Sequence, residues 1–100
     1  MPPVREGFGV LREGSQVVYR GMWRNGRFEG KGKLCWDGFT YEGDFRGGCF
    51  EGHGTLRWAN CEFMGRFQRH IADGEGTLLL GTHKCVGFWR EGALVRQLEG

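Results

Sequence analysis

The stretch YRGMWRNGRFEGKG at residues 19–32 decides the fold, because its pattern returns every 22 residues along the chain. An aromatic residue opens the pattern, a glycine follows two residues later, and a second ring follows two residues after that. An acid-Gly-x-Gly unit then closes it, as in residues 29–32. The opening positions are Tyr19, Tyr41, Phe63 and Cys85. Repeats of this length are typical of stacked supersecondary units that share one core.

The repeats divide a single domain. A length of 100 residues fits one domain, and Glu6-Gly7-Phe8-Gly9 forms a leading half-copy at a period of 23. We therefore expect one domain over residues 1–100, with a half-repeat at 5–18, repeats at 19–40, 41–62 and 63–84, and an incomplete repeat at 85–100.

Two-residue turn signals recur between the apolar stretches. They are Asn25-Gly26, Asp37-Gly38, Gly47-Gly48, Ala59-Asn60, Gly81-Thr82 and Glu91-Gly92. Pairs such as Asn-Gly and Gly-Gly favour tight hairpins, because both central residues then need a positive φ. The spacing leaves room for one strand between turns. The sequence thus predicts an all-β fold, a single elongated and twisted antiparallel meander of hairpins without a helix.

Closing these turns predicts which residues face each other. The expected pairs are Trp23 with Phe28, Gly21 with Gly30, Trp36 with Phe39, Leu34 with Tyr41, Gly30 with Phe45, Leu56 with Phe63 and Gly52 with Phe67. Rings would then lie opposite strand glycines, which have no side chain to obstruct them. Alternation places the rings on one face and charged residues on the other. The charged set is Arg20, Arg24, Glu29, Lys31, Glu42, Asp44, Glu51 and Asp73.

The segments YRGMWRNG at 19–26 and YEGDFRGG at 41–48 resemble MORN repeats, and the resemblance covers residues ~5 to 95. Three residues depart from the pattern: His70 replaces a turn glycine, Cys85 replaces a ring, and Arg96 stands where the next Gly-x-Gly should begin. The resemblance implies a twisted β-sheet solenoid that binds partner proteins along an extended groove. Such proteins act in membrane–cytoskeleton contacts, in flagella and as accessory domains of lipid kinases, and phospholipid binding has been proposed for some.

Composition argues against several classes. A net charge of +2 is low for a nucleic-acid-binding domain. No apolar run approaches the ~20 residues of a membrane span, and the start MPPVR lacks the apolar segment of a signal peptide. The four cysteines, Cys35, Cys49, Cys61 and Cys85, include no CxxC pair, so we expect reduced packing thiols of a cytoplasmic protein and no metal or other cofactor.

Catalysis has little support. Cys49, Glu51 and His53 share one predicted face, but a sheet of short hairpins offers no deep pocket that excludes water. Gly-x-Gly is followed by a strand, so no helix N-terminus is available for a phosphate. We expect a non-enzymatic protein.

Three candidate surfaces remain. The first is the aromatic face, expected to bind a partner protein: Tyr19, Trp23, Phe28, Trp36, Tyr41, Phe45, Trp58, Phe63, Phe67 and Trp89. The second is a basic cluster, a possible anion contact weighed against a merely solvated face: Arg20, Arg24, Arg27, Lys31 and Lys33. The third is an apolar C-terminal margin, on positions that are mostly charged in earlier repeats: Met64, Val86, Phe88, Leu94 and Val95.

These surfaces support different hypotheses. The leading one is a scaffold or adaptor that binds a partner protein in an aromatic groove, as a subunit of a larger cytoskeletal or membrane-associated assembly. Self-association through unpaired sheet edges is a second form of assembly. The alternative is a peripheral module that binds acidic phospholipids. We expect a cytoplasmic location, at the cytoskeleton, a cilium or flagellum, or a membrane face.

Overall fold

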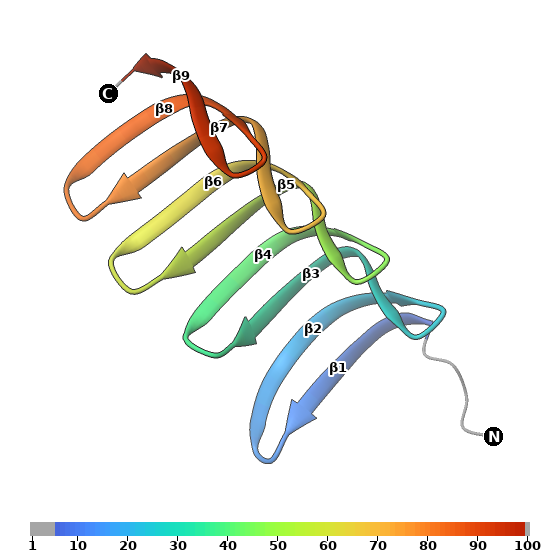
Figure 1. Cartoon of the computed structure of the whole chain (residues 1–100). Helices are drawn as coiled ribbons and strands as arrows, with labels where there is room; N and C mark the ends of the chain where they lie inside the picture. The colour runs from blue at the N-terminus through green and yellow to red at the C-terminus, as the bar shows by residue number, and fades with distance from the viewer. Residues whose placement is uncertain (1–5, 100) are drawn as a thin grey trace.

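A computed structural model describes residues 6–99 as one sheet of nine antiparallel strands (Figure 1). The strands lie in the sheet in their order along the chain, and each pairs with the next. The sheet extends over 51 × 24 × 16 Å, which confirms the predicted elongated meander. The strands are β1 (Gly7–Glu13), β2 (Gln16–Arg24), β3 (Arg27–Trp36), β4 (Phe39–Arg46), β5 (Cys49–Trp58), β6 (Cys61–Gln68), β7 (Ile71–Leu80), β8 (His83–Arg90) and β9 (Ala93–Glu99).

The turns form two rows, one along each side of the sheet. All six predicted turns lie between strands, and two more occur, at Gly14-Ser15 and at Arg69-His70. The second contains no glycine, and only the 22-residue period, in which His70 replaces a turn glycine, marks its place in the sequence. Arg69 and His70 nevertheless adopt φ values of 49° and 73°, in the left-handed region that glycine or asparagine usually occupies.

The register confirms six of the seven predicted pairs and corrects the seventh. Gly21 faces Gly32, not Gly30, because the pairing of β2 with β3 shifts between Gly21 and Trp23. The bulge in β3 includes Gly30, whose φ of 76° suits an irregularity of this kind. Equivalent shifts occur in the β4–β5 and β6–β7 pairs.

The bulges also correct the reason predicted for these glycines. Gly30 does pair with Phe45, and Gly52 with Phe67. However, a Cβ atom on Gly30 would meet the side chain of Met22, and one on Gly52 would lie 3.1 Å from Oδ2 of Asp44. Neither glycine makes room for a ring.

A different set of glycines makes that room. One glycine from each of β1 to β8 pairs with the next, in the row Gly9, Gly21, Gly32, Gly43, Gly54, Gly65, Gly76 and Gly87. A Cβ atom on Gly32 would collide with the ring of Tyr19, one on Gly54 with Tyr41, and one on Gly76 with Phe63. The second glycine of each Gly-x-Gly unit therefore accommodates the ring of the preceding strand.

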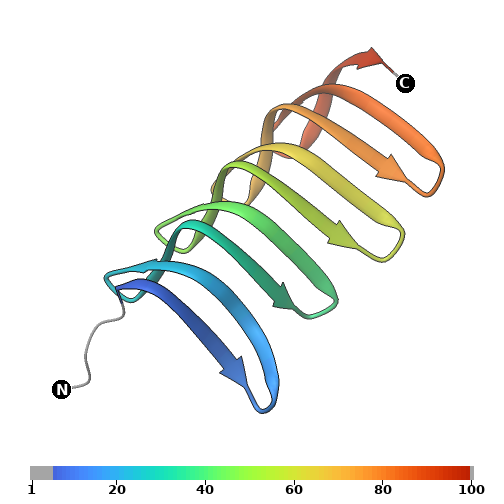
Figure 2. The same ribbon diagram turned by 180° about the vertical axis from the view of Figure 1, so that it is seen from behind.

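The strands bend strongly, so that the sheet forms a trough (Figure 2). Rings of the aromatic face form its buried core. Tyr19 and Tyr41 are fully buried there. Phe28 stacks on Tyr19 with ring centroids 3.8 Å apart, and Phe50 stacks on Tyr41 at 3.9 Å. Trp23, Phe45 and the following rings meet these stacks edge-on, at centroid distances near 5 Å. A one-layer sheet thus obtains a core by curling around its own rings.

Backbone hydrogen bonds tie successive hairpins together. The N–H groups of Gly48, His70 and Gly92 donate to the carbonyl oxygens of Phe28, Phe50 and Ala72, at 2.9 to 3.0 Å. Each bond therefore connects a turn to the residue twenty positions earlier, which lies near the start of a strand. These bonds stack the turns along one side of the sheet.

The last strand departs from the repeat. Gly87 faces Gln97, and the β8–β9 pairing shifts twice, between Val86 and Gly87 and between Phe88 and Trp89. The repeat would place Arg96 and Leu98 at the two Gly-x-Gly positions. β9 therefore lacks both glycines of the unit, and its pairing differs from that of the earlier strands.

Candidate binding groove

Curvature of the sheet divides the predicted aromatic face into buried and exposed residues. Seven of its ten members are buried in the core: Tyr19, Trp23, Tyr41, Phe45, Phe63, Phe67 and Trp89. Phe28 is half-buried. Trp36 and Trp58 alone among the ten are exposed, with 53% and 38% of their surface accessible. Most of the predicted contact surface is therefore already covered by the protein's own rings.

Two adjoining apolar hollows lie on the inner face and together form what we call the concave groove. The first, of about 380 Å³, is lined by Asp37, Gly38, Phe39, Phe50, Leu56 and Trp58. The second, of about 370 Å³, is lined by Leu56, Trp58, Phe63, Phe67, His70, Ile71, Ala72, Leu78, Trp89 and Gly92. Because Leu56 and Trp58 line both hollows, the groove continues from one repeat to the next.

One side of the trough carries exposed apolar residues, which we call the tryptophan margin: Trp36, Trp58 and Leu80. Each is the last residue of its strand and precedes a turn. Leu80 was not among the predicted site residues, although it occupies the same position as the tryptophans one repeat later. The 22-residue period was the signal that could have identified it.

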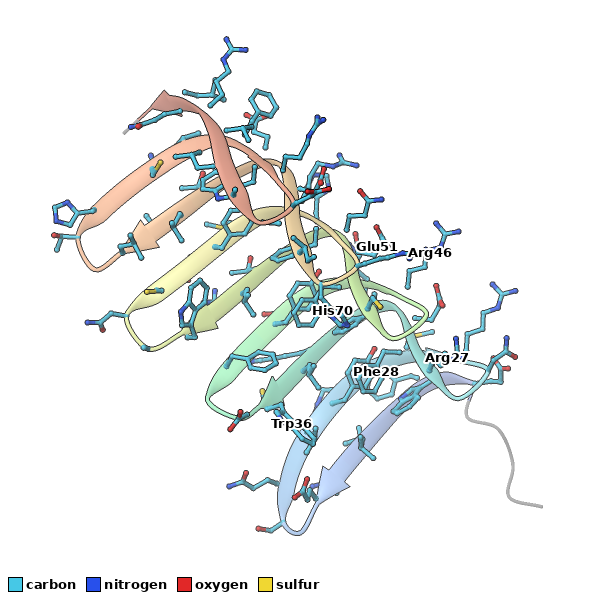
Figure 3. The ribbon with its side chains drawn as sticks, viewed as in Figure 1. Arg27, Phe28, Trp36, Arg46, Glu51 and His70 are labelled. Atoms are coloured by element: carbon cyan, nitrogen blue, oxygen red, sulfur yellow. The ribbon has the colours of Figure 1, made fainter. Side chains whose placement is uncertain are left out.

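The opposite side carries exposed arginines, which we call the arginine margin: Arg24, Arg27, Arg46, Arg69 and Arg90. Figure 3 shows Arg27 and Arg46 on this side and Trp36 on the other. Acidic residues of the repeat also lie on this side, among them Glu51, which Figure 3 labels there with Arg46. Two of these acids bond to turns. Glu29 accepts a hydrogen bond from the N–H of Gly47 at 3.0 Å, and Asp73 accepts one from Glu91 at 3.4 Å.

His70 closes part of the groove from the arginine margin (Figure 3). Its Nδ1 atom accepts a hydrogen bond from the N–H of Phe50 at 3.3 Å, and its ring meets the Phe50 ring edge-on with centroids 4.7 Å apart. The residue that breaks the turn pattern of the sequence thus contributes to the groove wall. Ile71, the first residue of β7, is exposed and also lines the groove.

Burial raises the pKa of both tyrosines of the core, Tyr19 and Tyr41. Loss of hydration on burial raises the pKa of Tyr19 to about 12. Burial also raises the pKa of Tyr41, and the nearby Asp44 carboxylate adds to the effect. Both phenols are therefore neutral structural groups at physiological pH.

The structure separates the predicted basic cluster into two groups. Arg20, Lys31 and Lys33 line a hollow of about 420 Å³ on the outer face, together with Phe8, Met22 and Glu42. Lys31 lies 2.6 Å from Oδ1 of Asp44. Arg24 and Arg27 instead face each other across a turn of the arginine margin.

The predicted C-terminal margin is partly open to solvent. Met64, Phe88, Leu94 and Val95 are exposed, whereas Val86 is half-buried. Val95 is the most open of the five, because the shifted pairing of β9 leaves it between the residues that face Trp89 and Phe88.

The grouping considered for catalysis does not form a pocket. His53 is exposed and lines a shallow outer hollow with Glu42 and Met64, whereas Cys49 is half-buried beside a turn. Within residues 6–99 no three metal-ligating side chains gather, and the same residues contain no helix that could cross a membrane. All four cysteines are free thiols.

Comparison with known families agrees with this architecture. The family model described as MORN repeat matches residues 19–38 and 41–60. These segments contain the β2–β3 and β4–β5 hairpins almost entirely. A search of curated proteins found no match.

Proposed function

Because the chain is a MORN-repeat protein, we propose that it is a non-enzymatic scaffold that holds a partner polypeptide in its concave groove. MORN repeats generally mediate protein or lipid interactions, and the family is generally non-enzymatic. The observation that carries the proposal is the pair of continuous apolar hollows, with exposed Trp58 in the wall of both and exposed Trp36 paired with Phe39 of the first. Exposed aromatic residues beside a groove are typical of protein contacts, where tryptophan is a frequent hot-spot residue.

The wider setting belongs to the same proposal. We place the protein in the cytoplasm, as one domain divided into the repeats given above and as a subunit of a cytoskeletal or membrane-associated assembly. The exposed C-terminal margin supports a second contact within that assembly, because Phe88 and Val95 are apolar and open to solvent.

Proximity labelling tests the groove directly. We expect the Trp36→Ser/Trp58→Ser chain to lose protein neighbours that the wild type labels. Arg57→Ser is the control, because Arg57 is exposed beside Trp58 in the sequence but lines neither hollow of the groove. An unchanged set of neighbours in the double variant, with the fold intact, contradicts the proposal.

One observation favours binding to acidic phospholipids as a second candidate function. Arg20, Lys31 and Lys33 surround the same outer hollow as the exposed apolar residues Phe8 and Met22. Basic residues beside apolar ones are typical of membrane surfaces, and each basic residue near an acidic bilayer contributes about 1 kcal/mol. Charge reversal at Arg20 and Lys33 should then abolish co-sedimentation with phosphatidylserine vesicles, as should raised salt.

A further inference from the structure

The third repeat lacks a ring that the first two contain. Phe28 lies over Tyr19 with an interplanar angle of 6°, and Phe50 lies over Tyr41 at 5°. Both phenylalanines face a core ring of the preceding strand, Trp23 or Phe45. In the third repeat the residue that faces Phe67 is Ala72.

Phe63 consequently has no stacked neighbour among the described residues. Its ring contacts are edge-on, with Phe67 at a centroid distance of 5.4 Å and with Trp89 at 5.0 Å. Phe63 keeps 4% of its surface accessible, whereas none of Tyr41 is accessible. The missing ring leaves one side of the third aromatic group open.

The second hollow of the groove lies at this position. Ala72, Phe63, Leu78 and Trp89 line it, and most of the surface that it presents is apolar. In the first hollow, by contrast, Phe50 occupies the equivalent place and forms part of the wall. The two preceding repeats therefore show which kind of side chain fits above Ala72, namely an aromatic one.

The positive charge of arginines near the second hollow favours a partner segment with acidic residues on either side of its aromatic residue. Arg69 and Arg90 are exposed, and each adjoins in the sequence a residue that lines the second hollow, His70 and Trp89 respectively. The exposed acid there is Glu91, while Asp73 is half-buried and bonds to the N–H of Glu91. Carboxylates of a partner segment could form ion pairs with the arginines on this side, because the guanidinium group binds carboxylates with two parallel hydrogen bonds.

We propose, on the basis of the groove function above, that the hollow over Ala72 receives an aromatic side chain from an acidic segment of the partner polypeptide. The ring packs against Ala72 between Phe63, Leu78 and Trp89. Carboxylates on either side of it face the arginine margin. The aromatic stack of the trough is thus completed by the partner in the repeat where the chain does not complete it.

Selection of displayed random peptides on the whole chain tests this inference. We expect enriched peptides to share one aromatic residue with aspartate or glutamate nearby, and replacing that residue with leucine should weaken binding at least tenfold. Ala72→Phe, which fills the hollow from within, should weaken the same peptides at least tenfold without lowering the melting temperature. Arg69→Glu/Arg90→Glu should weaken them several-fold and reduce the salt dependence of binding.

The controls separate this inference from the groove function. Should Ala72→Phe fail to fold, Ala72→Leu fills the hollow with a smaller side chain and should give the same loss. Peptides that share no aromatic residue, peptides that bind Ala72→Phe as well as wild type, or no enrichment at all overturn the inference. If bound peptides still depend on Trp36 and Trp58, the groove function stands without it. If replacing both tryptophans leaves the affinity for the peptides unchanged, the groove function itself is contradicted.

Discussion

The hydroxyl of Tyr41 donates a hydrogen bond of 2.8 Å to the carbonyl oxygen of Asp44, three residues further along the same strand. Tyr19 makes the same bond to Met22. Both carbonyl groups lie where the register shifts, so the sheet ladder is interrupted beside them. The tyrosine ring that packs over a glycine therefore also satisfies a backbone acceptor next to the bulge.

The third repeat lacks this hydrogen bond, because Phe63 has no hydroxyl. The equivalent shift occurs between Gly65 and Phe67, which places the carbonyl of Arg66 at the corresponding position. We expect Phe63→Tyr to raise the free energy of unfolding by about 1 kcal/mol, the net value of an ordinary hydrogen bond. Tyr41→Phe should lower it by about as much or slightly more, because it leaves a partly buried acceptor unpaired. Urea denaturation measures both, and a loss of stability in Phe63→Tyr would contradict this account.

Alkaline titration should reveal the burial of both phenols. The chain has two tyrosines, and burial raises the pKa of Tyr19 to about 12 from its ordinary value of 10.0. The pKa of Tyr41 is raised as well. The native state therefore keeps protons that the unfolded chain loses above pH 10. Stability should be complete below pH 10 and should fall as the pH rises toward 12.

Ultraviolet absorbance of tyrosinate measures this titration in the folded protein. We expect no transition near pH 10 while the circular dichroism of the sheet is unchanged. An ordinary titration near pH 10 in the folded state would show that at least one phenol is hydrated, contrary to the burial described above.

The two glycines of one Gly-x-Gly unit should respond differently to substitution. Gly54→Ala places a methyl group against the ring of Tyr41 and should cost roughly 1–3 kcal/mol or more, as overpacking does. Gly52→Ala meets no ring, but it forces alanine to a φ of 79°, at a cost of roughly 1–2 kcal/mol. Cys49→Ser should cost less than either. Thermal melts rank the stabilities of the three variants. A larger loss of stability in Gly52→Ala than in Gly54→Ala would support the original explanation, in which Gly52 makes room for the ring of Phe67.

The sequence predicts strands, turns and most pairs, because turn residues and alternating polarity are local properties. It does not predict the bulge at Gly30, since counting outward from Asn25-Gly26 assumes an uninterrupted ladder. Burial of Trp23 and exposure of Trp36 depend on how the strands bend, and no single strand encodes that curvature. The opening above Ala72 is visible only when the stacks of Phe28 and Phe50 are known. The fold was therefore largely predictable, whereas the groove required the register and the curvature.

The turn at Arg69-His70 offers a further test of backbone strain. His70 has a φ of 73°, so glycine fits its conformation and alanine does not. Both substitutions remove the ring that contacts Phe50, and they differ mainly in backbone strain. We expect His70→Gly to be more stable than His70→Ala by about 1 kcal/mol.

Asn60 supplies the matched control for this comparison. It is the second residue of the turn at Ala59-Asn60, and it is not among the described residues that have a positive φ. Asn60→Gly should therefore gain nothing over Asn60→Ala. Equal stabilities of the two His70 variants in urea denaturation would show that the turn relaxes instead of keeping its strained conformation.

The apolar C-terminal margin should mediate association if it is the second contact surface proposed above. Phe88 and Val95 are exposed, and neither belongs to the buried core. Phe88→Glu with Val95→Lys should therefore weaken binding to a neighbouring subunit while circular dichroism and the melting temperature change little. His83→Glu, on the same strand as Phe88, changes an exposed polar residue without removing apolar surface and should have a smaller effect. Analytical ultracentrifugation of the wild type and both variants, alone and with labelled neighbours, measures the difference. A wild-type chain that stays monomeric and binds its neighbours as tightly as the double variant does would rule out this margin as an interface.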